Sequence, residues 1–303
     1  MNHHRAASEY DKELDYMKKP ETLENLKTFL SIIKFAVFGA ATNGRRVWGA
    51  LRSVGLKPVC FLDNYKTGNE EISGLHIVTP ADFIRNNADY AILLGVMSEK
   101  SSAEILVQLH NLGIDPERII KFGEIVQMFE GVDFNWANSR ESEYDFHANN
   151  HVIERLAKWI GSEDMSVADL GCGQQYLKTL LLPHCKYIPV DYVSRSEDTL
   201  VCDFNENLPS LPVDVMFICG ALQCVKDPAR FLRWMCDHAA KKVIIRDQVY
   251  HQQTMYNKFF GYFSTPTIDD IEEIVHSQGF KTKHKDSYLQ GDTEFVLMCF
   301  ERI

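Results

Sequence analysis

Residues 166–192 read SVADLGCGQQYLKTLLLPHCKYIPVDY. This stretch runs from an apolar strand through a glycine turn and a helix into a second strand that ends in an acid. Residues 34–64, KFAVFGAATNGRRVWGALRSVGLKPVCFLDN, repeat the same order. Strands that alternate with helices are typical of parallel sheets covered on both faces. The sequence therefore predicts an α/β chain with two doubly wound, Rossmann-like domains.

The pattern divides the chain into a polar, helical lead-in over 1–33, a small Rossmann-like domain over 34–130, a linker over 131–147 and a second domain over 148–303. In the small domain we expect strands near 34–38, 58–62, 90–94 and 118–121, helices near 44–54, 80–86, 101–111 and 123–129, and a short extended excursion over 69–78. In the second domain we expect seven strands, near 166–170, 186–190, 199–202, 213–219, 242–247, 280–286 and 294–300, and helices near 148–160, 175–182, 227–238 and 267–278. Residues 248–266 are a candidate lid over a site.

The composition excludes several classes of protein. The 303 residues carry 32 Lys and Arg against 42 Asp and Glu, a net charge of −10, so the chain lacks the basic surface of a nucleic-acid-binding protein. No run approaches the roughly 20 apolar residues of a membrane span, and the polar N-terminus does not resemble a secretory signal. The eight cysteines form no CxxC pair and show no metal-ligand spacing, so we expect no metal, no disulfide framework and a reducing cytoplasm.

The glycine turn of the second domain lies among three acids. Gly171 and Gly173 allow a tight turn from strand to helix, at which backbone N–H groups can face a ligand. Asp169 ends the preceding strand, Asp191 follows Gly171 by 20 residues, and Asp203 lies 12 residues further on. Such a set suits a ligand with an amine, a ribose and an adenine amino group, and it would repel a pyrophosphate. S-adenosylmethionine fits this description, whereas a dinucleotide fits poorly.

Residues 166–303 resemble a class I S-adenosylmethionine-dependent methyltransferase. DLGCG, YIPVDY and CDFNENLP resemble that family's first three motifs, and FICGALQCVKDPARFL resembles its fourth strand and following helix. The resemblance implies a trimmed, seven-stranded methyltransferase sheet with S-adenosylmethionine as the cofactor. It implies Asp169, Gly171 and Gly173 around the methionine part, Asp191 at the ribose, and Asp203 and Phe204 at the adenine, while Cys172, Tyr192 and Gly220 complete the expected cofactor-binding set.

Two positions depart from the family pattern. Gln175 stands where a third glycine is usual, so the turn is expected to follow a different path. Only seven residues separate Tyr192 from Leu200, so the usual helix between the second and third strands is missing or reduced to a turn. Trimmed members of this kind often accompany bacterial surface-polysaccharide genes, and by analogy the acceptor is expected to be a sugar or nucleotide-sugar.

Candidate catalytic residues follow the fourth and fifth expected strands. Methyl transfer to a hydroxyl benefits from a base. His251 is the first candidate because an imidazole titrates near neutral pH, and Asp247 is the second. Gln223 and Tyr250 are expected on the substrate side.

The small domain carries its own glycine turn. Gly39, Ala41 and Gly44 match Gly-x-Ala-x-x-Gly, and Asp63 follows Gly39 by 24 residues, as a ribose-binding acid would. However, Ala41 places a methyl group where backbone must approach a pyrophosphate, and we expect only about four strands, which weighs against full dinucleotide binding. Arg45 is placed to meet a phosphate.

Residues 34–125 resemble the small Rossmann-like domain at the N-terminus of certain sugar acyltransferases. This resemblance implies a nucleotide-sugar or glycan docking role, with Gly39, Gly44, Arg45 and Asp63 as substrate-binding residues. A scaffold or dimerisation module is equally open.

Three functions therefore stand side by side. The first is methyl transfer from S-adenosylmethionine to a small acceptor in surface-polysaccharide biosynthesis. The second is an NAD(P)-dependent oxidoreductase that uses the N-terminal domain, and the third is a non-catalytic scaffold with a vestigial donor pocket. The expected partner is a small-molecule or nucleotide-sugar substrate, without nucleic acid or a membrane span, and a homodimer is left open.

Overall fold

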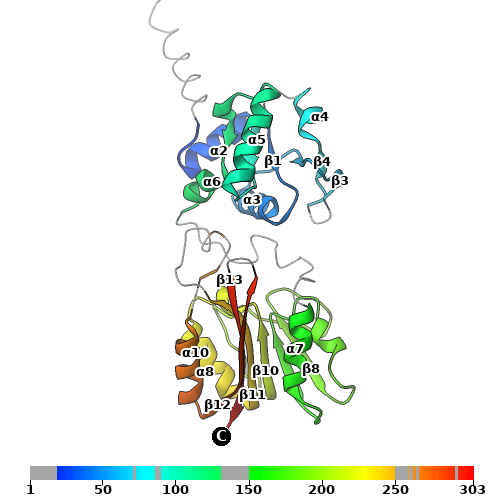
Figure 1. Ribbon diagram of the computed structural model, residues 1–303, viewed down its shortest axis with the longest axis vertical. Helices are drawn as coiled ribbons and strands as arrows, with labels where there is room; N and C mark the ends of the chain where they lie inside the picture. Colours follow the sequence, from blue (N-terminus) through cyan, green and yellow to red (C-terminus); the bar gives the residue numbers. More distant parts are fainter. Residues whose placement is uncertain are drawn as a thin grey trace, which may run out of the picture. The chain divides into compact units, whose positions relative to one another are not determined.

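The computed structural model describes residues 19–70, 73–85, 90–130, 150–249, 259, 262–263, 266–290 and 293–303. The chain divides into two compact units, Met1–Glu141 and Ser142–Ile303. Each unit contains one mainly parallel sheet and several helices (Figure 1). This arrangement confirms the predicted α/β class.

The second unit is built on a seven-stranded sheet in the order β12-β13-β11-β10-β7-β8-β9. The strands are β7 (Ser166–Leu170), β8 (Lys186–Asp191), β9 (Leu200–Val201), β10 (Val213–Cys219), β11 (Ala239–Val249), β12 (Phe280–Gln290) and β13 (Thr293–Arg302). All neighbours are parallel except β13, which is antiparallel to β11 and to β12. In chain order, β9-β8-β7-β10-β11 is the 3-2-1-4-5 arrangement of doubly wound nucleotide-binding sheets. The direction of winding reverses between β7 and β10, and ligands bind at the carboxyl ends of the strands at such a switch point.

Helices cover both faces of this sheet. They are α7 (Asn150–Ile160), α8 (Pro228–His238) and α10 (Ile268–Ser277). Side chains alternate between the faces along each strand: Met216 and Ile218 pack with α8 and α10, whereas Val215 and Phe217 pack with α7. Figure 1 shows α8 and α10 together and α7 apart from them. The apolar run over 215–218 in β10 is therefore explained by burial on both faces.

The two helices that share a face begin with strong capping signals. Asp227 accepts the N–H of Arg230 at 2.9 Å, and Pro228 occupies the first helical position of α8. At the start of α10, Thr267 and Asp270 form a reciprocal capping box. These signals explain why α8 and α10 lie close to the ranges expected from the sequence.

One exposed edge of the sheet is β12, and β9 is the other. The solvent-facing residues of β12 include Lys281, Lys283 and Lys285, and its pairing with β13 shifts register between Thr282 and His284, which marks a β-bulge. Lysines and bulges are the means by which native edge strands resist pairing with other chains.

The first unit has a six-stranded sheet in the order β3-β4-β2-β1-β5-β6. The strands are β1 (Phe35–Phe38), β2 (Phe61–Leu62), β3 (Gly68–Asn69), β4 (His76–Val78), β5 (Ala91–Leu94) and β6 (Ile119–Ile120), and only β3 runs antiparallel to its neighbour. The expectation of about four strands was wrong. β3 and β4 have two and three residues, which is too short to stand out from the extended excursion expected over 69–78.

The helices of the first unit also lie on two faces of its sheet. They are α2 (Leu23–Ile32), α3 (Thr42–Ser53), α4 (Pro80–Ile84), α5 (Glu99–Asn111) and α6 (Phe122–Met128), with a 3-10 turn over Pro116–Arg118. Ala36 and Phe38 of β1 pack in one cluster with residues of α4 and α5. Phe35 and Val37 point the other way and are equally buried, and α3 and α6 contact β1 and β5. The run FAVF, which forms β1, is thus buried on both faces of the sheet.

Several expectations are corrected or lie outside the described residues. The helix expected over 175–182 is only a 3-10 turn, η4 (Tyr176–Thr179). No helix stands between β8 and β9, as the short spacing predicted. The linker over 131–147, residues 1–18 of the lead-in and most of the candidate lid over 248–266 lie outside the described residues.

The turn between β1 and α3 leaves no room for a side chain at Gly44. A Cβ atom there would lie 1.7 Å from the carbonyl oxygen of Gly39. We expect Gly44→Ala to lower the free energy of unfolding of the first unit by about 2–4 kcal/mol, because backbone would have to move. Urea denaturation of the full chain measures this, with the exposed neighbour Thr42→Ala as control. Equal stability of the two variants would contradict the steric argument.

Candidate functional site

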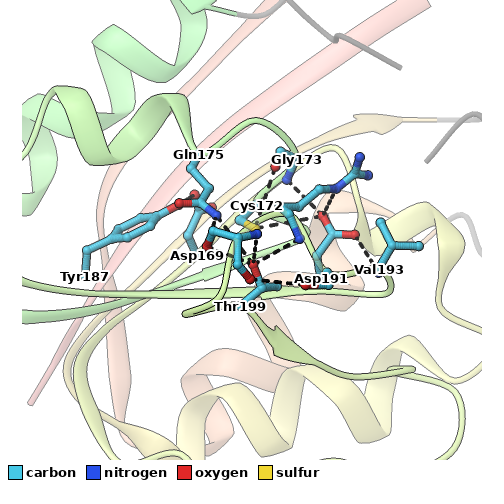
Figure 2. A network of polar contacts seen from close by, with 11 residues as sticks. Asp169, Cys172, Gly173, Gln175, Tyr187, Asp191, Val193 and Thr199 are labelled. Carbon is cyan, nitrogen blue, oxygen red and sulfur yellow. Dashed lines mark hydrogen bonds and ion pairs between the residues drawn. The ribbon is translucent and has the colours of Figure 1, made fainter. Parts of the chain in front are cut away.

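The switch point of the second sheet brings two acidic side chains together. Asp169 lies in β7 one residue before its end, and Asp191 is the last residue of β8. Both are buried. Figure 2 shows the two carboxyl groups on either side of the turn that contains Cys172 and Gly173. The sequence predicted this grouping, because neighbouring parallel strands end at the same edge of a sheet.

Asp169 is held by a tyrosine. Its Oδ2 accepts the hydroxyl proton of Tyr187 at 2.7 Å. Burial raises the pKa of Asp169 to about 7, a rise that the Tyr187 hydrogen bond opposes and the charge of Asp191 reinforces. The carboxyl group therefore changes charge near neutral pH, and a cation beside it would favour the ionised form.

Asp191 fastens the glycine turn to the second strand. Its Oδ2 accepts the N–H of Gly173 at 2.9 Å, and its Oδ1 accepts the N–H of Val193 at 3.2 Å. Arg195 Nε lies 3.5 Å from Oδ2. A carboxylate offers about four lone-pair sites, so within the described residues Oδ1 keeps capacity for a further donor.

The N–H groups of the turn point into the protein. Gly171 and Cys172 both donate to the carbonyl oxygen of Val190, at 2.8 and 3.0 Å, and Gly173 donates to Asp191. The expectation that these groups face a ligand is therefore corrected for all three residues. These three residues offer no cradle of N–H donors to a phosphate, and the two buried carboxyl groups, of which Asp191 is paired with Arg195, lie beside them.

The two glycines of the turn serve different needs. At Gly171, with φ of +73°, a Cβ atom would lie 2.7 Å from the Cβ of Ala221. At Gly173, with φ of +49°, no atom lies within 4 Å of the position that a Cβ would take. Gly171 thus permits close packing, whereas Gly173 borders open space in which a ligand can lie.

Gln175 adopts a left-handed backbone conformation of the kind that favours glycine. Its φ and ψ are 59° and 32°, in the left-handed region, and it is the one non-glycine residue with positive φ in the described part of the chain. Its Nε2 donates to Ser196 Oγ at 2.8 Å and reaches Thr199 Oγ1 at 3.4 Å (Figure 2). These contacts hold the side chain and offset the backbone strain, and the expected different path of the turn stays a prediction.

A compact turn stands in place of the helix between β8 and β9. Thr199 Oγ1 accepts the N–H groups of Arg195 and Ser196, at 3.1 and 2.9 Å. The N–H of Thr199 returns to the carbonyl oxygen of Ser196 at 3.1 Å. Gln175 therefore connects the glycine turn to an ordered element that begins four residues after Asp191.

The residues expected at the adenine lie beyond β9. Asp203 follows the last residue of β9 by two positions, and its Oδ1 accepts the N–H of Asn205 at 2.9 Å. The ring of Phe204 packs 4.8 Å from that of Phe231 in the core beside α8. Tyr192 is half-buried after Asp191. Phe204 thus has a packing role in addition to the one expected.

The ends of β10 and β11 carry the expected substrate residues. Gly220, with φ of +82°, donates its N–H to the carbonyl oxygen of Arg246 at 2.8 Å. Burial raises the pKa of Asp247 to about 6, while the N–H groups of Gln248, Leu222 and Gln223 and the charge of Arg246 lower it. Within the described residues, Gln223 Oε1 is a buried side-chain atom without a hydrogen-bond partner.

Two expected site residues, Tyr250 and His251, lie outside the described residues. The described residues therefore give no position for His251, the first candidate base.

In the first unit, Asp63 repeats the arrangement of Asp191. Its Oδ2 accepts the N–H of Ala40 at 2.9 Å, and its Oδ1 accepts those of Tyr65 and Lys66 at 2.9 and 3.1 Å. Lys66 Nζ donates to the carbonyl oxygen of Ala40 at 3.1 Å. Asp63 thus holds its own glycine turn with backbone donors on both oxygens, which leaves less capacity for a ribose than the sequence suggested.

The remaining expected residues of the first unit are also held internally. Arg45 Nε lies 2.8 Å from Glu70 Oε1, and the Glu70 side chain is 1% exposed. Gly39, with φ of +102°, and Gly44 pack backbone against backbone. Arg45 therefore has an acidic partner where a phosphate was expected.

Two residues of the second site were missed by the sequence analysis. Tyr187 lies four residues before Asp191 on β8, and Arg246 precedes Asp247 on β11. The period of two along a strand places Tyr187 on the same face as Asp191, a signal that could have found it. Arg246 carried no comparable signal, because its neighbours come from distant strands.

The described residues provide neither a metal-ligand cluster nor a membrane-spanning helix. They contain no group of His, Cys, Asp and Glu side chains able to hold a metal ion. No helix among them has the length and apolar character needed to cross a membrane.

Comparison with protein-family models and with curated proteins finds no match. Several solved structures are similar to part of the chain. A magnesium protoporphyrin IX methyltransferase from Synechocystis PCC 6803, with S-adenosylmethionine bound, has a TM-score of 0.42 and 11% identity over 59% of this chain and 95% of that one. A 1,6-didemethyltoxoflavin N1-methyltransferase from Burkholderia thailandensis has a TM-score of 0.43 and 12% identity over 68% of this chain and 91% of that one. Likenesses at this level carry no functional argument, so we infer the function from the residues of the site.

The raised pKa of Asp169 predicts a pH-dependent stability. A buried carboxyl group with a raised pKa stabilises the folded state fully below pH 3.8, the pKa of this group in the unfolded chain. That stabilisation is lost as the pH rises through about 7, the pKa in the folded state. Asp169→Asn cannot ionise and keeps an acceptor for Tyr187. We expect its free energy of unfolding to rise relative to wild type between about pH 4 and pH 8.

Asp214 provides the control of opposite sign. Its pKa is lowered, chiefly by the N–H of Ser166, so its contribution is present above pH 3.8 and is lost on acidification. In denaturant titrations between about pH 2 and pH 8, Asp169→Asn should therefore gain stability relative to wild type above about pH 4, whereas Asp214→Asn should be less stable than wild type by a constant amount above about pH 4 and should approach wild type on further acidification. Parallel curves for Asp169→Asn and wild type would refute the assignment of a raised pKa.

The left-handed backbone of Gln175 yields a second prediction. Gln175→Ala loses both side-chain contacts and keeps the strain, so we expect a loss of about 1–2 kcal/mol in the free energy of unfolding. Gln175→Gly loses the same contacts and relieves strain, and should be about 1 kcal/mol more stable than the alanine variant. The exposed neighbour Gln174→Ala is the matched control. Identical unfolding curves for the glycine and alanine variants would contradict this account.

Proposed function

We propose that the second unit binds S-adenosylmethionine and transfers its methyl group to a small acceptor. The observation that carries this proposal is the pair of buried carboxyl groups, Asp169 and Asp191, at a switch point whose glycine turn directs its N–H groups inward. Such a site favours a cation and disfavours a phosphate. A sulfonium nucleoside combines a positive charge with a ribose.

The residues present fit the parts of this ligand in order along the sheet edge. Asp169 faces the ammonium group, and Asp191 Oδ1 has capacity to accept a ribose hydroxyl. The open space beside Gly173 admits the nucleoside. Asp203 and Phe204 follow β9, which neighbours β8, and so continue in the direction of the adenine.

The sulfonium supplies an activated methyl group when it is bound, so the protein's main task is alignment of the acceptor atom. Asp247 is the described candidate for a base. It is buried, and its pKa near 6 leaves it largely ionised at neutral pH. His251 stays a candidate from the sequence.

We propose a sugar or nucleotide-sugar in surface-polysaccharide biosynthesis as the acceptor. The support is the resemblance of residues 34–125 to the sugar-acyltransferase domain. A cytoplasmic setting belongs to the same proposal, and a homodimer stays open.

One observation favours the dinucleotide alternative. In chain order, β4-β2-β1-β5-β6 of the first unit is also a 3-2-1-4-5 arrangement. Against it stand the backbone donors on Asp63, the pairing of Arg45 with Glu70, and the methyl group of Ala41. We therefore rank NAD(P)-dependent oxidation second and a scaffold without a bound ligand third.

Isothermal titration of the full chain separates these functions. We expect S-adenosylmethionine and S-adenosylhomocysteine to bind and NAD not to bind. Asp191→Asn, which keeps the shape of the side chain, should weaken both by about 10- to 100-fold, the value of a charge-assisted hydrogen bond.

Asp63→Asn is the matched control, because Asp63 occupies the equivalent place in the first unit; it should leave both affinities unchanged. Binding of NAD alone, with dependence on Asp63, would establish the oxidoreductase instead. A folded chain that binds none of the three ligands would leave the scaffold.

A further inference from the structure

A tyrosine hydroxyl is bonded to the acid that precedes the glycine turn. Tyr187 lies in β8, which pairs with β7, and is in register with Val167. Asp169 lies two residues beyond Val167 on the same face of β7, toward the carboxyl end of that strand. The Tyr187 side chain therefore runs along the sheet, and its hydroxyl donates to Asp169 Oδ2 at 2.7 Å (Figure 2).

The surroundings of Tyr187 hold its ring in place. The ring packs against the apolar cluster that α7 covers, which contains Val167 and Leu177. Lys178 Nζ of η4 lies 5.9 Å from the centre of the ring. Burial and the charge of Asp169 raise the pKa of Tyr187, so the hydroxyl keeps its proton near neutral pH. The hydroxyl is therefore a donor to Asp169 whenever that carboxyl group is ionised.

The hydrogen bond gives the two oxygens of Asp169 different roles. The residue is 5% exposed, and Tyr187 occupies its Oδ2. Within the described residues, Oδ1 of Asp169 accepts no hydrogen bond. An ionised carboxylate accepts hydrogen bonds at both oxygens. Oδ1 is therefore the oxygen that is left for a donor group of a ligand.

Other titratable side chains face Asp169 from the elements around it: Asp191 at the end of β8, Cys172 in the turn and Cys219 at the end of β10. Arg195 Nε lies 3.5 Å from Asp191 Oδ2 and so opposes the negative charge of that group. Burial raises the pKa of both thiols, that of Cys219 to about 12, so both stay neutral near pH 7. The thiols therefore do not compensate the charge of Asp169.

The Tyr187 hydrogen bond opposes the two effects that favour a protonated Asp169. Burial and the charge of Asp191 raise the pKa of Asp169, the hydrogen bond lowers it, and the pKa is about 7. A hydrogen bond donated to a carboxylate favours its ionised form. Without the hydroxyl, Asp169 would keep its proton to a higher pH, and a cationic ligand would meet a neutral group.

We propose that Tyr187 is a positioning residue for the donor: it holds Oδ2 of Asp169, leaves Oδ1 for a cationic group and keeps the carboxyl group ionised down to neutral pH. This inference rests on the proposed function, in which Asp169 faces the ammonium group of the donor. Tyr187 acts through Asp169. It thereby sets the lower end of the pH range in which the donor binds.

The pH dependence of S-adenosylhomocysteine binding tests this role, because this product keeps the ammonium group. Isothermal titrations of the full chain and of Tyr187→Phe are compared between about pH 6 and pH 9. We expect affinities within about threefold of each other at pH 9, and binding about 10- to 100-fold weaker in the variant at pH 6. Loss of a hydrogen bond to a charged group raises the pKa of Asp169 by about one to two units. The ratio of the two affinities cancels the titration of the ligand, which both chains share.

Tyr176→Phe is the matched control. The Tyr176 hydroxyl donates to Glu154 Oε1, also at 2.7 Å, but this bond lies at the surface and does not involve Asp169. The control should keep the wild-type profile at every pH. Phenylalanine also keeps the ring of Tyr187, and a merely structural role of that residue would weaken binding by one factor across the whole pH range.

The carboxyl carbon of Asp169 reports the same effect without a ligand. It is followed by NMR in a chain with isotopically labelled aspartate, and Asp169→Asn assigns its signal. The midpoint should lie near pH 7 in the wild type and should rise by about one to two pH units in Tyr187→Phe. In the wild type, the free-chain midpoint should also appear in the affinity profile.

Each contrary outcome has its own meaning. A ratio of affinities that does not change with pH, or an unchanged NMR midpoint in Tyr187→Phe, would overturn the inference. If Tyr187→Phe does not fold, a wild-type affinity profile without the midpoint of Asp169 would overturn it instead. A folded wild-type chain that binds no S-adenosylhomocysteine would refute the proposed function, even where the NMR midpoint moves as expected, and this role of Tyr187 with it.

Discussion

A carboxylate at the end of the second strand holds the glycine turn in both units. Asp191 accepts the N–H of Gly173, and Asp63 accepts the N–H of Ala40, each at 2.9 Å. The turn cannot then direct these N–H groups to a ligand, although a glycine turn at a switch point is the usual place for a phosphate. In the second unit the consequence is electrostatic: two buried carboxyl groups define the site, and the preference for a cation follows from them.

The same constraint explains why the second unit tolerates a glutamine in the turn. Gly173 is fixed by Asp191, and Gln175 continues the turn in a left-handed conformation. Its side chain meets Ser196 and Thr199 because the connection to β9 is short and folds back toward the turn. The short connection between β8 and β9 and the glutamine in the turn are therefore linked by direct side-chain contacts.

The fold was largely predictable from the sequence, whereas the chemistry of the site was predictable only in part. Buried runs such as FAVF and VDVMFIC, together with capping residues such as Asp227, indicate strands and helices through local physics. The segment YLKTLLL was expected as a helix, but Gln175 before it provides no side-chain cap and only one 3-10 turn forms. The inward direction of the turn's N–H groups and the contact of Arg246 with Tyr288 depend on strand register, which a single sequence does not contain.

The lysines and the bulge of β12 bear on how this protein can associate with its own copies. A continuous sheet across two copies of the second unit would require β12 of one copy to pair with β12 of the other. In a parallel pairing in register, the positive side chains of Lys281, Lys283 and Lys285 would then face their own counterparts. Like charges held opposite each other on paired strands are destabilising. Self-association of the second unit through a continuous intermolecular sheet at β12 is thereby disfavoured.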